Sequence, residues 1–152
     1  MAKKKESQGE EGKKKKDKKG IIFKVGRRRM AVANATAKPG TGKIIVNGEL
    51  LKNMKNDVLR LRIEEPFILC DKNDWKTYDF TAIAKGGGTT GQSDAVRMAF
   101  ARALVEVFGE ELKRKFAEYD RNLLVYDPRR TEPHKPPRSS QGPRRYKQRS
   151  KR

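Results

Sequence analysis

The hydrophobic residues of this chain are confined to its middle, and their spacing changes along the chain from a strand-like to a helix-like pattern. Between residues 21 and 46 the apolar positions form short extended runs, among them Ile21–Phe23 and Ile44–Val46. The second run is followed by Asn47-Gly48, a pair suited to the positive dihedrals of a tight hairpin turn. We therefore expect two or three antiparallel strands in this part of the chain.

A short helix is predicted after these strands. Met54, Val58 and Leu61 recur at intervals of four and three residues, which places them on one helical face. The helix should stop before Pro66, because a proline disfavours helical backbone in the residue before it; the four residues after it fit either a strand or the helix end. Residues 77–85 are rich in aromatic and β-branched side chains, which predicts another strand.

The clearest element is an amphipathic helix that Gly109 ends. A second, shorter helix carries Leu112, Phe116 and Tyr119 on its apolar side, and residues 122–126 are expected to dock on the core. These patterns predict a small α/β (α+β) domain in which helices cover one sheet. The apolar stripe of the first helix consists of Ala95, Val96, Ala99, Phe100, Ala103, Leu104 and Val107, and its opposite face of Arg97, Arg102 and Glu106.

The 152 residues carry a formal net charge of +19, which is concentrated at both ends. Residues 1–20 hold nine basic and four acidic side chains (+5) with no apolar periodicity, which predicts a disordered Lys-rich arm. Residues 127–152 hold ten basic and two acidic side chains (+8) and five of the seven prolines, which favours an extended basic tail. We therefore divide the chain into this arm, a globular domain over residues 21–126, and this tail.

Such a charge favours a polyanionic partner, either a nucleic acid or an anionic membrane surface. No apolar run approaches the roughly 20 residues that cross a bilayer, and the arm lacks the apolar segment of a signal peptide. We therefore expect a cytoplasmic protein without a membrane partner. Cys70 and His134 are the only residues of their types, too few for a disulfide or a zinc site, so no metal or other cofactor is expected.

Residues 86–91 read Gly-Gly-Gly-Thr-Thr-Gly, which matches the dinucleotide fingerprint G-x-G-x-x-G between a predicted strand and a predicted helix. The context argues against a nucleotide enzyme, because Glu110 and Glu111 open a helix instead of following a further parallel strand. No Gly-Lys-Ser/Thr follows either, as a P-loop requires. Two interpretations stay open: a phosphate site at a helix N-terminus, or a loop that only turns the chain and caps the helix.

The triplet Arg27-Arg28-Arg29 precedes the long extended run that contains Val32. Strand alternation sends neighbouring side chains to opposite faces, so the three arginines cannot all share one side. They suit contacts with structured RNA, although such a triplet can also be a solvated strand edge.

No catalytic constellation is visible. Glu64-Glu65, and Asp71 with Asp74, lie in predicted exposed turns without a histidine partner, and nothing nearby activates Cys70. The sequence therefore predicts that the protein is not an enzyme and has no small-molecule substrate.

Several motifs, in their order and at their intervals, closely resemble one family, the universal ninth protein of the small ribosomal subunit, over residues 25–152. The resemblance implies a two-layer domain with a left-handed β-α-β crossover, a place in the subunit head, and three partners: small-subunit ribosomal RNA, neighbouring ribosomal proteins and peptidyl-site transfer RNA. The motifs are Gly26-Arg27-Arg28-Arg29 with Ala31-Val32-Ala33, Pro39-Gly40 with Gly42-Lys43-Ile44-Ile45-Val46-Asn47-Gly48, Gly86-Gly87-Gly88 with Gly91-Gln92, Ala101-Arg102-Ala103-Leu104, Asp127-Pro128-Arg129-Arg130 and the ending Ser150-Lys151-Arg152.

The resemblance, joined to the arginine triplet and the glycine loop, gives an expected set of RNA-binding residues in a structural ribosomal protein. Two other functions stay open: a free basic nucleic-acid chaperone, which the tails alone permit, and a nucleotide-dependent enzyme using residues 86–91. The residues expected to bind ribosomal RNA are Arg27, Arg28, Arg29, Lys43, Lys85, Gly86, Gly87, Gly88, Gln92, Arg129, Arg130, Lys135, Arg138, Arg144, Arg145, Tyr146 and Lys147, and those expected to bind transfer RNA are Arg149, Ser150, Lys151 and Arg152.

Overall fold

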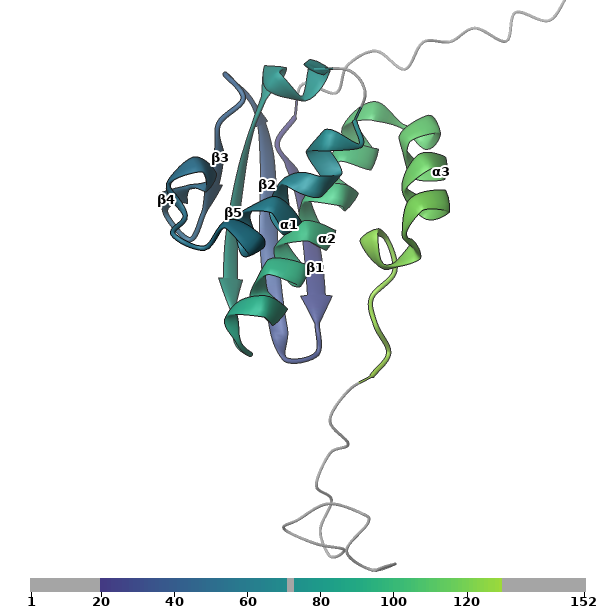
Figure 1. Ribbon diagram of the computed structural model, residues 1–152. Helices are drawn as coiled ribbons and strands as arrows, with labels where there is room; N and C mark the ends of the chain where they lie inside the picture. Colours follow the sequence, from purple (N-terminus) through teal and green to yellow (C-terminus); the bar gives the residue numbers. More distant parts are fainter. Residues whose placement is uncertain (1–19, 71–72, 130–152) are drawn as a thin grey trace, which may run out of the picture.

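The computed structural model describes residues 20–70 and 73–129. In this part of the chain a five-stranded sheet is covered on one face by helices (Figure 1), so the predicted α/β class is confirmed. The strands are β1 (Ile22–Arg28), β2 (Ala31–Pro39), β3 (Ile44–Val46), β4 (Glu49–Leu50) and β5 (Tyr78–Lys85); the helices are α1 (Asp57–Ile68), α2 (Thr89–Phe108) and α3 (Glu110–Tyr119), with 3-10 turns η1 (Leu51–Asn53), η2 (Asn73–Thr77) and η3 (Arg121–Leu123).

The strand order β1-β2-β5-β3-β4 differs from a simple antiparallel series. β2 pairs antiparallel with β1 and β5, whereas β3 lies beyond β5 and pairs with it in parallel. The expected antiparallel pairing is confirmed for β1 with β2, but β3 does not pair with β2, because β5 lies between them. The loop after β2 causes the change, because it crosses the start of β5: Gly40 N–H donates to Thr77 O (2.8 Å) and Phe80 N–H donates to Lys43 O (2.8 Å).

The chain passes from β3 to β5 through α1, which lies on the same face of the sheet as α2 (Figure 1). In this view the helices lie in front of the sheet, β5 runs downward, and β3 lies to its left. Seen from the helix side with the strands pointing downward, a connection from β3 through α1 to β5 on its right is a left-handed crossover. Almost all β-α-β crossovers are right-handed. The handedness implied by the family resemblance is thus confirmed.

The hairpin predicted at Asn47-Gly48 joins β3 to β4. Both residues have positive φ, 51° for Asn47 and 89° for Gly48, as the tight primed turn requires. The Asn47 side chain also accepts a hydrogen bond from Ala84 N–H (2.7 Å), which ties this turn to β5.

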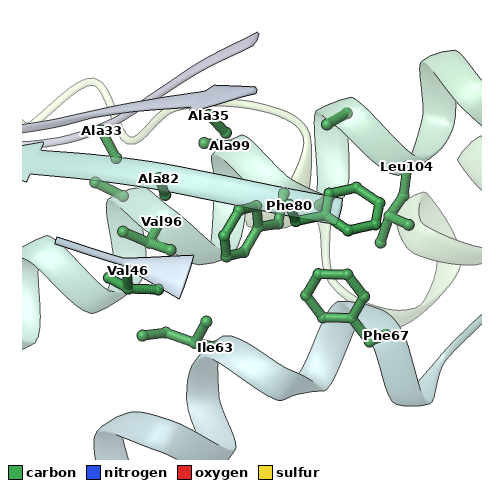
Figure 2. Close-up of a cluster of buried hydrophobic side chains, with 14 of the residues drawn as sticks. Ala33, Ala35, Val46, Ile63, Phe67, Phe80, Ala82, Val96, Ala99 and Leu104 are labelled. Atoms are coloured by element: carbon green, nitrogen blue, oxygen red, sulfur yellow. The ribbon is translucent and has the colours of Figure 1, made fainter. Parts of the chain in front are cut away.

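The core lies between the sheet and α2 (Figure 2). The alternate alanines of β2, which include Ala33 and Ala35, face alanines of α2, and these small side chains let helix and sheet approach closely. At Gly26 of β1 the approach is closest, since an added Cβ would lie 2.0 Å from Ala95 O. Elsewhere Phe67, Phe80 and Phe100 fill the space, with ring centroids 5.0 to 5.9 Å apart.

Helix α1 does not bury the face that the sequence pattern predicted. Val58 is 72% exposed and Leu61 54% exposed, whereas Ile63, Pro66 and Phe67 are buried. Met54 lies before the helix, which is capped by Asn56 accepting from Val58 N–H and Leu59 N–H, so a spacing counted from Met54 selected the wrong side.

The expectation that α1 stops before Pro66 is also wrong, because the helix continues to Ile68. Pro66 lies in its last turn, where the missing N–H removes one helical hydrogen bond, and the buried ring contributes apolar packing. The following residues belong to the helix end, since Leu69 N–H donates to Glu65 O (3.1 Å).

Both predicted C-terminal helices are confirmed, with two corrections to their faces. α2 is buried around most of its circumference, so Arg97 and Arg102 are partly covered. In α3 Leu112 is buried but Tyr119 is 58% exposed. Leu123 of η3 is fully buried, which confirms that this segment docks on the core. Within the described residues no helix is long and apolar enough to cross a membrane.

Candidate nucleic-acid interface

One end of the sheet brings the arginine triplet and the glycine loop together. Gly86 and Gly87 have φ of 79° and 63°, which let the loop between β5 and α2 fold against the β1–β2 turn. A Cβ at Gly86 would lie 2.6 Å from Met30 O, and one at Gly87 would lie 3.3 Å from Ala31 Cβ. Two motifs separated by more than 50 residues of sequence therefore form one surface.

The three arginines have different surroundings, as strand alternation predicted. Arg27 is exposed on the face of the sheet that carries no helix, and Arg29 is exposed in the turn with φ of 52°. Arg28 points to the helices, where it forms an ion pair with Asp127 and lies 3.4 Å from Asp94. Arg27 and Arg29 can contact an outside anion, whereas Arg28 is held by two carboxylates of the domain.

Lys85 extends the exposed cationic surface across the sheet. Arg27 and Lys85 both pair with Val32, one from β1 and the other from β5. The two strands that carry these cations lie about 10 Å apart, twice the usual strand spacing. Since all three residues share the helix-free face, Arg27 and Lys85 flank Val32 in a row.

The N-terminus of α2 adds backbone donors at the same end. Gly88 is its N-cap, no side chain caps it, and its first turn contains no acidic residue. Such an end attracts anions through free N–H groups and the helix dipole. The Gln92 side chain donates to Gly86 O (3.1 Å), which closes the glycine loop. The loop therefore has the backbone donors that a phosphate site needs. Its contacts also show that it turns the chain from β5 into α2.

The start of the tail is fixed beside this surface (Figure 1). Asp127 is 7% exposed and accepts hydrogen bonds from the backbone N–H of Arg129 (2.9 Å) and its guanidinium (2.7 Å), in addition to its ion pair with Arg28. Arg102 donates to Leu124 O (2.8 and 3.0 Å) and to Val25 O (2.6 Å), and burial lowers the pKa of its guanidinium. These contacts hold the last described residues, up to Arg129, against the domain near the arginine triplet.

Further arginines are held within the domain. Arg97 lies between Glu65 (2.6 Å) and Asp120 (2.9 Å), and Arg62 lies 3.0 Å from Asp94. A hydrogen bond with Glu65 raises the pKa of Tyr119. The sequence pattern does not reveal this network, because its members come from α1, α2, α3 and the turn that follows α3. The signal in the sequence that could have indicated these ion pairs was the position of Arg97 and Arg102 in a helical segment whose other residues are almost all apolar.

Lys43 does not join this surface. It follows the loop after β2, which lies at the opposite end of the sheet, and its N–H donates to Asp79 Oδ1 (2.9 Å). The predicted contacts in the tail fall outside the described residues. These are Arg130, Lys135, Arg138, Arg144, Arg145, Tyr146, Lys147, Arg149, Ser150, Lys151 and Arg152.

Comparison with known proteins assigns the family. The family model for ribosomal protein S9/S16 matches residues 26–152. The chain belongs to this family. Small ribosomal subunit protein uS9 of Methanococcus maripaludis (strain C7) is 47% identical over 131 residues, which cover 86% of this chain and 97% of the relative. The protein of the same name from Aeropyrum pernix is 37% identical over 131 residues, which cover 76% and 87%.

This membership confirms the resemblance carried by the sequence motifs. The family is one of structural ribosomal proteins and not a class of enzymes. The glycine loop accordingly belongs to a ribosomal protein, in which its shown contacts are with the β1–β2 turn. In the described part of the chain no group of three or more His, Cys, Asp or Glu side chains could hold a metal ion.

Proposed function

We propose that this ribosomal protein binds ribosomal RNA in the small subunit through two connected parts, the sheet end that carries Arg27, Arg29 and Lys85, and the basic tail. The supporting observation is that the cations at this end differ in what they contact. Arg28 is bound by carboxylates of the domain, whereas the three others are exposed beside an uncapped helix N-terminus. A rigid surface of this kind positions phosphates.

The proposed mechanism is phosphate neutralisation with release of counterions. Each neutralised phosphate contributes about −0.7 to −0.9 to the slope of log affinity against log salt concentration, so about six contacts give a slope near −5. Filter binding of the full chain to small-subunit ribosomal RNA over a series of salt concentrations measures it. A slope shallower than about −2 contradicts the mechanism.

We further propose that the tail threads along ribosomal RNA from Arg129 to Lys147, and that its tip contacts peptidyl-site transfer RNA through Arg149, Ser150, Lys151 and Arg152. The contacts of Asp127 with Arg28 and Arg129 support this division, because they fix the last described residues beside the end of the sheet that carries the arginine triplet. Its location would then be the cytoplasmic ribosome, with the neighbouring proteins of the subunit head as further partners.

Deletion of Lys151 and Arg152 tests the role of the tip. The truncated chain should enter small subunits as the full chain does, while retention of transfer RNA in the peptidyl site falls, because contacts at an exposed end position a ligand and not the fold. Sedimentation measures incorporation, and filter retention of labelled transfer RNA on purified subunits measures the second property. A truncated chain that never enters subunits contradicts this division of roles.

The alternative, a free nucleic-acid chaperone, is tested by the same sedimentation. A tagged full chain should migrate with small subunits at moderate salt. Recovery of the chain only in the light fractions would favour the chaperone and contradict the ribosomal assignment.

A further inference from the structure

A cavity of about 780 Å³ lies at the end of the sheet opposite the arginine turn. Its walls come from β3, the β4–η1 segment, the last turn of α1, and η2. They include Leu51, Phe67 and Trp75, and two large apolar side chains at the cavity are open to solvent, Leu50 at 45% and Ile68 at 70%. A cavity of this size and lining falls within the range of sites that bind organic groups.

The charged groups of the cavity favour an anion. Lys43, Lys52 and Lys76 line it, against one carboxylate, that of Glu64. Glu64 in turn lies 3.8 Å from Arg60, which offsets its charge. A ligand of this cavity must therefore offer an apolar surface and a negative charge together.

Two contacts hold this arrangement in place. Asp79 Oδ1 accepts hydrogen bonds from Thr41 N–H (2.8 Å) and Lys43 N–H (2.9 Å), which fixes the loop that carries Lys43. The Trp75 ring packs on Phe67 at a centroid distance of 5.1 Å. The Lys76 ammonium lies 5.9 Å from the centroid of the Trp75 ring, so an aromatic surface and a cation are already adjacent.

We propose that this cavity binds one unstacked nucleotide of RNA, with the base against Trp75 and Ile68 and the phosphates at Lys43 and Lys52. A nucleotide supplies a flat apolar face and an anion in one unit, whereas an apolar side chain leaves the lysines without an anion. Proteins bind unpaired RNA bases by stacking them on aromatic side chains in this way. The inference rests on the proposed RNA-binding function and adds a second site to it.

Trp75 gives the test, because it is the only tryptophan of the chain and lies in the cavity wall. The full chain is titrated with a single-stranded RNA hexamer and with a duplex of the same sequence, each labelled so that binding is followed by anisotropy. The hexamer should quench Trp75 emission to saturation, whereas the duplex, whose bases are stacked, should bind without quenching.

Matched variants separate the two sites. Lys52→Ala should weaken hexamer-dependent quenching about fivefold, the loss expected for one charge-assisted phosphate contact. Lys85→Ala, at the opposite end, should lower total RNA affinity and leave the half-saturation point of quenching unchanged. A near-native circular dichroism spectrum for both variants excludes misfolding as the cause.

Each outcome has a distinct meaning. Saturable RNA binding with no change in Trp75 emission overturns the nucleotide site and leaves the proposed RNA-binding function intact. Absence of RNA binding overturns both. Quenching by an acidic, aromatic peptide but not by the hexamer also overturns the inference, and assigns the cavity to a neighbouring protein.

Discussion

The two ends of the sheet present cations in opposite ways. At the turn between β1 and β2, Arg29 is exposed where the glycine loop packs closely on the backbone of the turn. The neighbouring Arg28 forms ion pairs with carboxylates of the domain. At the other end, Lys43 and Lys52 border a cavity with aromatic and aliphatic walls. The first arrangement suits phosphates alone, whereas the second suits a phosphate joined to a base. Under the two proposals above, similar charge on one small domain serves two kinds of RNA contact.

The ends also differ in how their cations are supported. Behind the arginine turn, Arg28 and Arg62 pair with Asp94, and Arg28 pairs with Asp127 as well. At the cavity the loop before β3 depends on the Asp79 carboxylate, which accepts backbone hydrogen bonds. Disrupting the first support should cost global stability, while disrupting the second should act locally.

The largest effect should follow Arg28→Ala. This change removes the Arg28 guanidinium from two carboxylates, that of Asp94 and that of buried Asp127, which keeps only Arg129. We expect a loss of about 3 kcal/mol in the free energy of unfolding, measured in urea. Arg27→Ala on the same strand is the control, because its side chain is exposed; its stability should change by less than about 0.5 kcal/mol. Equal stability losses in the two variants would show that the ion pairs behind the turn contribute little.

Gly86→Ala should produce the next largest effect. The residue has φ of 79°, and an added Cβ would meet Met30 O at 2.6 Å, so we expect a loss of about 1 to 3 kcal/mol. Gly88→Ser is the matched control, since no atom lies within 4 Å of its added Cβ and serine is a good N-cap. Urea unfolding compares the two, and an unchanged Gly86 variant would mean that the glycine loop does not need its contact with the turn.

Replacement of both Arg27 and Arg29 by alanine should weaken RNA binding without unfolding the domain. Two lost phosphate contacts should make the salt slope shallower by about 1.4 to 1.8 in filter binding. Lys113→Ala is the control, because Lys113 lies on α3 and pairs with Glu110 at 3.1 Å; its slope should match the unmodified chain. A double variant with an unchanged slope would place the phosphate contacts elsewhere.

The smallest effect should be a local pH dependence at the cavity end. Backbone hydrogen bonds from Lys43 and then Thr41 hold the pKa of Asp79 below its ordinary value of 3.8. Stability from this carboxylate is present above pH 3.8 and is lost as the pH falls through the lower folded pKa. The amide proton shifts of Thr41 and Lys43 in NMR spectra should titrate together with a midpoint below 3.8. A midpoint at or above that value would contradict the hydrogen bonds.

Much of the fold could be predicted where the decisive interactions are local. Asn47-Gly48 forms its predicted turn because both residues tolerate positive φ, and α2 follows its apolar stripe. The face of α1 could not be read in the same way. Its pattern includes exposed Val58 and Leu61, and the side that packs is chosen by the place of Phe67 beside Phe80 and Phe100.

The candidate site shows the same division. The sequence identified the arginine triplet, the glycine loop and the basic tail, because charge and backbone freedom belong to each residue wherever it lies. It grouped Lys43 with them, although the structure places Lys43 at the other end. It also missed that Arg28 and Arg97 are held by carboxylates, since those partners come from other elements.

The sequence by itself determined a small cationic α/β domain with its hairpin, its main helix and its family motifs, all of which depend on residue type and short-range spacing. Only the tertiary structure decided which cations face outward, that β3 pairs in parallel with β5, and that a cavity forms beside Trp75. The physical reason is that ion pairing, strand order and cavity shape depend on distances between elements far apart in the chain, and a linear pattern does not contain those distances.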